Sequence, residues 1–136
     1  MVQVELSKII IDEKRQDQII VLKEKDGERQ FPIVIGFLEA SAIKMKLSGV
    51  EPPRPMTHDL LVTVIETLGA KVDRLVIDKL FNSTFHAKLE IRLKTGRKKC
   101  VDTRPSDGIA VAVRTNAHIF VDEDVLDKSA IFKTSH

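Results

Sequence analysis

The stretch from Asp102 to Ala110, Asp-Thr-Arg-Pro-Ser-Asp-Gly-Ile-Ala, joins a charged segment directly to a small, apolar one. Pro105 presets φ for the first position of a helix and loses no hydrogen bond there. Asp107 then falls at about the third helical position, where its carboxylate meets free backbone N–H groups and the positive end of the helix dipole. The stretch therefore predicts a strand that ends near Asp102 and a helix from Pro105 to about Thr115.

Helix capping accounts for Asp107, but it leaves Asp102 and Arg104 unexplained. A strand-end acid, a helix-start acid and an arginine at one edge of a sheet are suited to a divalent metal and a phosphate. The alternative is structural, because helix caps are common and functional sites are few. The residues alone leave both interpretations open.

Upstream of this stretch, the pattern predicts three strands and a helix. Alternating and apolar runs predict strands at residues 2–11, 19–22 and 30–35, with charged residues 12–17 forming the first turn. Pro32 places the third strand at an edge or near a bulge. Helical spacing then predicts a helix from Phe37 to Leu47. Glu39, in its first turn, either stabilises the helix dipole or belongs to a site.

A proline-rich connection at residues 50–56 leads to a second helix, for which Thr57 is a favourable N-cap. Apolar residues form one stripe along this helix before Gly69 ends it, namely Leu61, Val64, Ile65 and Leu68. His58 and Asp59 lie in its first turn. A charged imidazole is unfavourable at a helix N-terminus, so a neutral His58 could act as a base or a ligand; a lone surface histidine is the simpler alternative.

The second half of the chain repeats the order of the first. Strands are predicted at residues 72–81, 84–93 and 97–102, followed by the helix at Pro105, which is apolar nearly all round and is expected to be buried. A short strand at 119–121, helical turns at 122–128 and a solvated tail at 129–136 complete the chain. Glycines that end hairpins and carboxylates that open helices recur 68 to 69 residues apart, which suggests two β-β-β-α pseudo-repeats or a coincidence. The predicted fold class is α+β, a twisted, mostly antiparallel (mixed) sheet covered by helices.

The 136 residues, 43% of them hydrophobic, are enough for one core, so a single domain is expected with its core at about residues 2–128. A net charge of +2 is low for a protein that holds duplex by charge alone. The absence of Trp and Tyr argues against an aromatic platform that stacks single strands. Nucleic acid is permitted as a partner, without sequence readout.

The single cysteine, Cys100, excludes an internal disulfide and a cysteine-based zinc site. Its place in a predicted strand favours a buried, inert thiol over a nucleophile activated by neighbouring lysines. The N-terminus lacks the features of a signal peptide, and no apolar run is long enough to span a membrane. A cytoplasmic protein without a membrane partner is therefore expected.

Three stretches, taken together, resemble the bifunctional nuclease domain family of bacteria and plants: the Asp102–Ile109 stretch with Ala112 and Arg114, residues 32–43, and residues 54–61. They occur in the family's order and span roughly residues 20 to 125. Gly108 stands where the family pattern suggests alanine, and His86 where it suggests an aromatic residue. The charged positions agree.

The resemblance implies a domain that cleaves DNA and RNA and forms a wedge-shaped homodimer with a groove. From it and from residue chemistry, we expect a metal-dependent nuclease without strong sequence specificity. The candidate catalytic residues are His58, Asp59, Asp102, Arg104 and Asp107. Candidate ligands for Mg²⁺ or Mn²⁺ are Glu39, Asp102 and Asp107, and candidate substrate-binding residues are Arg54, Thr57, Ser106 and Arg114. One alternative is a non-catalytic module that binds a nucleotide, an anion or a protein. A third possibility is a structural dimer in which contacts of the Arg104–Asp107 type are intramolecular ion pairs.

Overall fold

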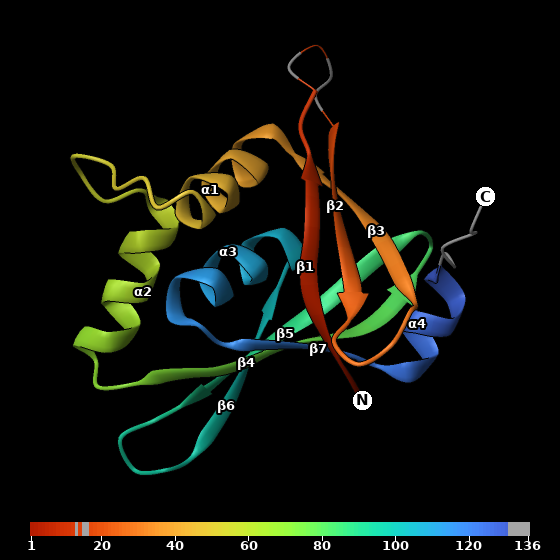
Figure 1. Cartoon of the computed structure of the whole chain (residues 1–136). Helices are drawn as coiled ribbons and strands as arrows, with labels where there is room; N and C mark the ends of the chain where they lie inside the picture. The colour runs from red at the N-terminus through yellow and green to blue at the C-terminus, as the bar shows by residue number, and fades with distance from the viewer. Residues whose placement is uncertain (13, 15–16, 131–136) are drawn as a thin grey trace.

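In the computed structural model, which describes residues 1–12, 14 and 17–130, seven strands form one curled sheet with four helices against it (Figure 1). The strands are β1 (Val2–Ile10), β2 (Asp17–Glu24), β3 (Gln30–Gly36), β4 (Lys71–Phe81), β5 (Thr84–Arg92), β6 (Lys98–Thr103) and β7 (His118–Val121). The helices are α1 (Phe37–Leu47), α2 (Thr57–Thr67), α3 (Pro105–Thr115) and α4 (Glu123–Ser129). The predicted elements are confirmed to within a few residues, while the expected tail beyond 130 and most of the turn at 12–17 lie outside the described residues.

The sheet has the strand order β3-β2-β1-β7-β4-β5-β6, which confirms an α+β fold and places Pro32 on an edge strand as predicted. Among the described strands, only β4 and β7 pair in parallel. Two three-stranded meanders, β1–β3 and β4–β6, flank β7, and each is followed by a helix. The element order thus matches the proposed β-β-β-α repeat, with α2 inserted between the two units.

Helix α3 is the central element of the core. Seven of its eleven residues are buried, as its apolar sequence predicts. It packs against β4 and β5, and α1 and α2 pack against it in turn (Figure 1). Because α3 touches both other long helices, it determines where their N-termini lie.

Gly108 allows α3 to approach the sheet closely. A Cβ atom at this position would overlap the side chain of Leu75 on β4, and Leu75 is fully buried. Packing therefore explains why Gly108 stands where the family pattern suggests alanine. The close contact between α3 and β4 offsets the lower helix propensity of glycine.

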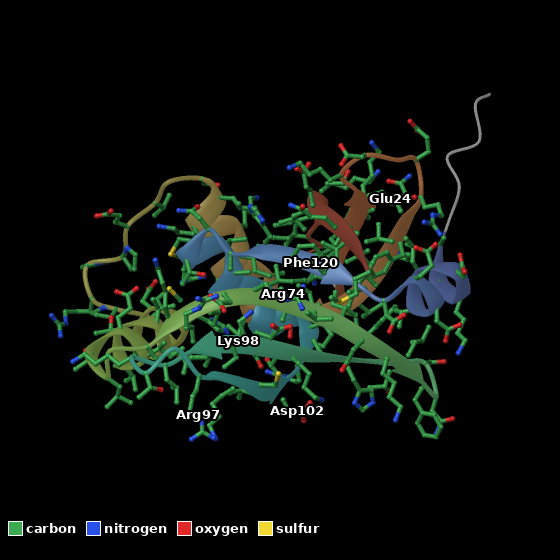
Figure 2. All side chains as sticks on the ribbon, turned by 90° about the horizontal axis from the view of Figure 1, so that it is seen from below. Glu24, Arg74, Arg97, Lys98, Asp102 and Phe120 are labelled. Atoms are coloured by element: carbon green, nitrogen blue, oxygen red, sulfur yellow. The ribbon has the colours of Figure 1, made fainter. Side chains whose placement is uncertain are left out.

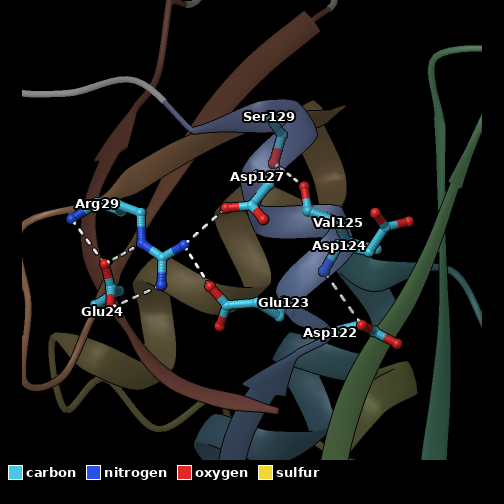
Figure 3. Close-up of polar contacts among 8 residues, drawn as sticks. All are labelled: Glu24, Arg29, Asp122, Glu123, Asp124, Val125, Asp127 and Ser129. Carbon is cyan, nitrogen blue, oxygen red and sulfur yellow. Dashed lines mark hydrogen bonds and ion pairs between the residues drawn. The ribbon is translucent and has the colours of Figure 1, made fainter.

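Helix α4 is tied to the β2–β3 hairpin by Arg29 (Figure 3). The guanidinium donates through Nη1 to Glu123 (2.6 Å) and Asp127 (2.9 Å) on α4, and through Nε to Glu24 (2.6 Å) on β2. These contacts raise the pKa of Arg29 and lower that of Glu24. The C-terminal helix is thereby held to the first meander.

Three details differ from the sequence analysis. The stripe on α2 is not a buried face: Leu61, Val64 and Leu68 are exposed and only Ile65 is buried, because α2 contacts α3 over a narrow strip. Thr57 is the first residue of α2, and Met56 occupies the N-cap position.

The prediction of a buried thiol at Cys100 was wrong. Cys100 is exposed, because it lies on the edge strand β6 opposite Glu90 and faces away from the helices.

None of the helices in the described residues has the length and apolar character that crossing a membrane requires.

Candidate functional site

The starts of α1, α2 and α3 each carry a carboxylate at the third helical residue, namely Glu39, Asp59 and Asp107. In each helix the N-cap residue has an extended backbone and forms no side-chain capping hydrogen bond. A carboxylate in the first turn compensates for this, because it is attracted by unpaired N–H groups and by the helix dipole. The common position is therefore a local effect, whereas the partners of each carboxylate come from tertiary packing.

Arg104, His58, Asp107 and Glu39 form one connected set of polar contacts, which we call the Arg104 network. Arg104 donates through Nε to Asp107 Oδ2 at 2.9 Å and through Nη2 to Glu39 Oε1 at 3.2 Å. His58 Nε2 lies 2.9 Å from Asp107 Oδ1. Asp107 thus links a cation and an imidazole, and residues from three helix starts meet although 65 positions separate Glu39 from Arg104 in sequence.

The members of the Arg104 network differ in exposure. The side chain of His58 is 13% exposed and that of Asp107 30%, whereas that of Arg104 is 68% exposed. Burial raises the pKa of Asp107, but hydrogen bonds from His58 and Arg104 outweigh it, so the pKa is lowered overall. Asp107 is therefore ionised at neutral pH, and its charge raises the pKa of Arg104.

Asp59 and Arg114 form a separate pair that joins the helices. The Arg114 side chain is 5% exposed and donates through Nε to Asp59 Oδ1 at 2.7 Å. Its other nitrogens donate to the carbonyl oxygens of Ala110 (2.9 Å) and Ala42 (3.2 Å). Asp59 also accepts from Met56 N, and that backbone hydrogen bond is the largest cause of its lowered pKa. These predicted site residues connect α1, α2 and α3 from within.

Asp102 lies apart from the Arg104 network, at the margin of the molecule (Figure 2). Its side chain is 76% exposed on the edge strand β6 and accepts a hydrogen bond from Lys88 Nζ at 3.1 Å. Of the three predicted metal ligands, Glu39 and Asp107 meet through Arg104, and Asp102 does not join them. Within residues 1–12, 14 and 17–130, no three His, Cys, Asp or Glu side chains are grouped so as to hold a metal ion.

The remaining candidates lie around the helix starts. Arg54 and Thr57 are exposed, in the loop before α2 and at its first residue. Ser106 is buried at the second residue of α3, next to Asp107. It lines a cleft with residues of β3 and of the β4–β5 turn. The β3 residues belong to the family stretch 32–43, but no site role was predicted for them or for the turn, because only the curl of the sheet brings these segments to α3.

The fold and the site together define a class: a curled α+β domain in which three helix starts present an imidazole, carboxylates and an exposed arginine at one surface. Residues 20–134 match the model of the bifunctional nuclease domain. Over 131 residues the chain is 37% identical to an uncharacterised protein of Mycobacterium tuberculosis (strain H37Rv), an alignment that covers 96% of this chain and 77% of that protein. The chain therefore belongs to the bifunctional nuclease domain family, as its motifs suggested.

Plant relatives are more distant and longer. Bifunctional nuclease 1 of Arabidopsis thaliana is 27% identical over 107 residues, which are 76% of this chain and 33% of that protein. Bifunctional nuclease 2 of Oryza sativa is 27% identical over 114 residues, which are 82% of this chain and 35% of that protein. The match to these plant proteins is thus to one part of each.

Proposed function

We propose that this protein hydrolyses phosphodiester bonds of DNA and RNA without strong sequence specificity, at the surface formed by the Arg104 network. The observation that carries the proposal is the contact of His58 with Asp107, beside an exposed arginine, in a member of a nuclease family. Nucleic acid is the substrate, and a homodimer in the cytoplasm is the expected form.

His58 is the proposed general base. With Asp107 ionised, the favoured arrangement has the proton on His58 Nε2, donated to Asp107 Oδ1. The lone pair then lies on Nδ1, which can take a proton from water as the water oxygen attacks phosphorus. Asp107 holds the ring and stabilises the imidazolium that forms, a positioning role also known from other acid–histidine pairs.

Arg104 is proposed to stabilise the negative charge of the pentavalent phosphate. A guanidinium suits phosphate oxygens because it presents several donors in one plane. Its high exposure leaves it accessible to substrate, and Glu39 fixes its orientation from the second side. When the bond from phosphorus to the leaving oxygen breaks, that oxygen takes its proton from solvent.

The divalent metal stays a prediction. Of the proposed metal ligands, Glu39 and Asp107 lie on either side of Arg104. Both carboxylates already accept a hydrogen bond from its guanidinium. The described side chains therefore do not present a preformed ligand set, and the proposed steps are assigned to protein groups alone.

The test is a cleavage assay on single-stranded and duplex DNA and RNA with Mg²⁺, Mn²⁺ or EDTA. We expect the parent to cleave, and Asp107→Asn to cleave about a hundredfold more slowly, which corresponds to about 3 kcal/mol in the barrier. Asp26→Asn, an exposed change in the β2–β3 turn, is the matched control. Equal activity of the parent and Asp107→Asn preparations would indicate a contaminating nuclease or a different site.

A further inference from the structure

A cleft of about 400 Å³ opens beside the Arg104 network, between the edge strand β3 and the start of α3. β3 and β5 stand first and sixth in the strand order, yet Val34 on β3 and Phe85 on β5 both line this cleft. The curl of the sheet closes it from two sides, while Arg104 and Ser106 line it at the start of α3. Its volume lies within the range of about 300–1,000 Å³ that is usual for small-molecule sites.

Ser106 provides the first sign of a ligand. The residue is only 6% exposed, and its hydroxyl makes no hydrogen bond within the described part of the chain. In that part, the one fully enclosed side-chain atom without a partner is Asp78 Oδ1, so the Ser106 hydroxyl reaches the cleft it lines. The hydroxyl of an otherwise buried serine is thus free, on the cleft side, to donate a hydrogen bond to a bound group.

The donors around Ser106 suit an anion. The backbone N–H groups of Ser106 and Asp107 are in the first turn of α3 and have no intrahelical acceptor. Arg104 lines the same cleft, and its Nη1 makes no hydrogen bond to the described residues. Asp107 does not cancel this preference, because His58 and Arg104 occupy both of its carboxylate oxygens.

The rest of the cleft has a different character. Pro32, Val34 and Phe85 give it an apolar wall, which suits a sugar or a base better than a free ion. Asp17, a carboxylate at the beginning of β2, also lines the cleft and opposes a bound anion. A cleft of about 400 Å³ is within the size range of sites for one unpaired nucleotide, whereas a base in a duplex would first have to leave its stack to enter it.

We propose that this cleft is a subsite for one phosphate-bearing nucleotide of a single-stranded substrate, with the phosphate at Ser106 and Arg104 and the sugar or base against Pro32, Val34 and Phe85. The proposal rests on the proposed nuclease function, since it names the substrate group held beside the Arg104 network.

The experiment titrates the whole protein, in EDTA, with uridine 5′-monophosphate and follows backbone amide shifts by NMR. We expect the shifts to centre on the amides of Ser106, Asp107 and Gly108. Ser106→Ala should weaken binding about tenfold, and Asp17→Asn should tighten it severalfold by removing the opposing charge. Ser7→Ala, an exposed serine on β1, is the matched control and should bind like the parent.

The outcomes separate this subsite from the nuclease itself. If the parent cleaves single strands while Ser106→Ala and Asp17→Asn change neither the Kd of the nucleotide nor KM, the subsite is wrong and the nuclease proposal stands. If the nucleotide binds with the expected pattern but nothing is cleaved, the subsite stands as a binding site. Equal affinity for inorganic phosphate and the nucleotide, or for duplex and single strand, would overturn the nucleotide assignment.

Discussion

Glu39, Asp59 and Asp107 occupy the same position in three helices, and their partners give them different roles. Asp59 is bound by a nearly buried arginine and a backbone N–H group, which suits a structural contact. Asp107 is bound by an imidazole and an exposed guanidinium, which suits chemistry at the surface. All three carboxylates share the same position at a helix start. Their different roles therefore come from their different partners.

Replacing Arg114 by methionine should destabilise the protein by about 2–3 kcal/mol, because the change leaves Asp59 and two carbonyl groups without their donor. Denaturant unfolding followed by circular dichroism measures this loss. Arg97→Met, at an exposed position before β6, should change stability by less than about 0.5 kcal/mol. Similar stability of the Arg114 variant and the parent would show that Arg114 does not hold the helices together.

The Asp107 carboxylate should make stability depend on acid pH. Its pKa is lower in the folded state than the ordinary value of 3.8, so it contributes stability that is fully present above the unfolded-state pKa and lost as pH falls through the folded-state pKa. Asp107→Asn does not titrate there and should lose less stability than the parent between about pH 5 and pH 2. Urea unfolding at a series of pH values gives both slopes; identical slopes would refute the shift.

At the scale of elements, α3 positions the site because it is buried against the sheet and touches α1 and α2. Its first turn carries Ser106 and Asp107, and Arg104 precedes it. The sequence predicted this helix and its start well, since proline and the following carboxylate are local signals. The sequence also predicted the strands. It could not show that most of the apolar stripe of α2 would be exposed, because that depends on how narrow the surface of α3 is against which α2 packs.

Gly108→Ala should destabilise the protein by about 1–3 kcal/mol despite the better helix propensity of alanine, because the added Cβ overlaps Leu75. Leu75→Val in the same chain should recover part of the loss by making room, although it costs some burial on its own. Thermal unfolding of the single and double variants measures this coupling. If Gly108→Ala is stabilising, α3 does not approach β4 closely enough for Leu75 to exclude a Cβ atom at position 108.

At the scale of the whole molecule, the curl of the sheet brings together segments that the sequence separates. The contact of Arg104 with Glu39 and the cleft between β3 and α3 both depend on it. Motifs and helix starts in the sequence predict Glu39, His58, Arg104 and Asp107 as site candidates. Asp102 is predicted with them because a strand end beside a helix start suggests proximity, whereas the pleat of β6 directs Asp102 toward Lys88.

The two meanders also leave two sheet edges, β3 and β6. Large apolar side chains are exposed on α2 (Leu60, Leu61 and Val64) and at its C-cap (Leu68). Free edges and apolar surface are commonly covered by a second copy of the chain. Light scattering at tens of micromolar should therefore give twice the mass of one chain. Leu68→Glu should shift the protein toward monomer, and Phe81→Glu, at the far end of β4, should not. A monomeric parent at these concentrations would contradict the prediction.

The central claim is that His58 and Asp107 act as one unit in phosphodiester cleavage, and a double-mutant cycle on the cleavage rate tests it most directly. His58→Asn and Asp107→Asn should each slow cleavage by about a hundredfold, and the double variant should be little slower than either, because removing one member already disables the pair. His118→Asn, at an exposed histidine on β7, controls for the loss of an imidazole. Losses that multiply to about ten-thousandfold in the double variant, or single variants that cleave like the parent, would contradict the claim.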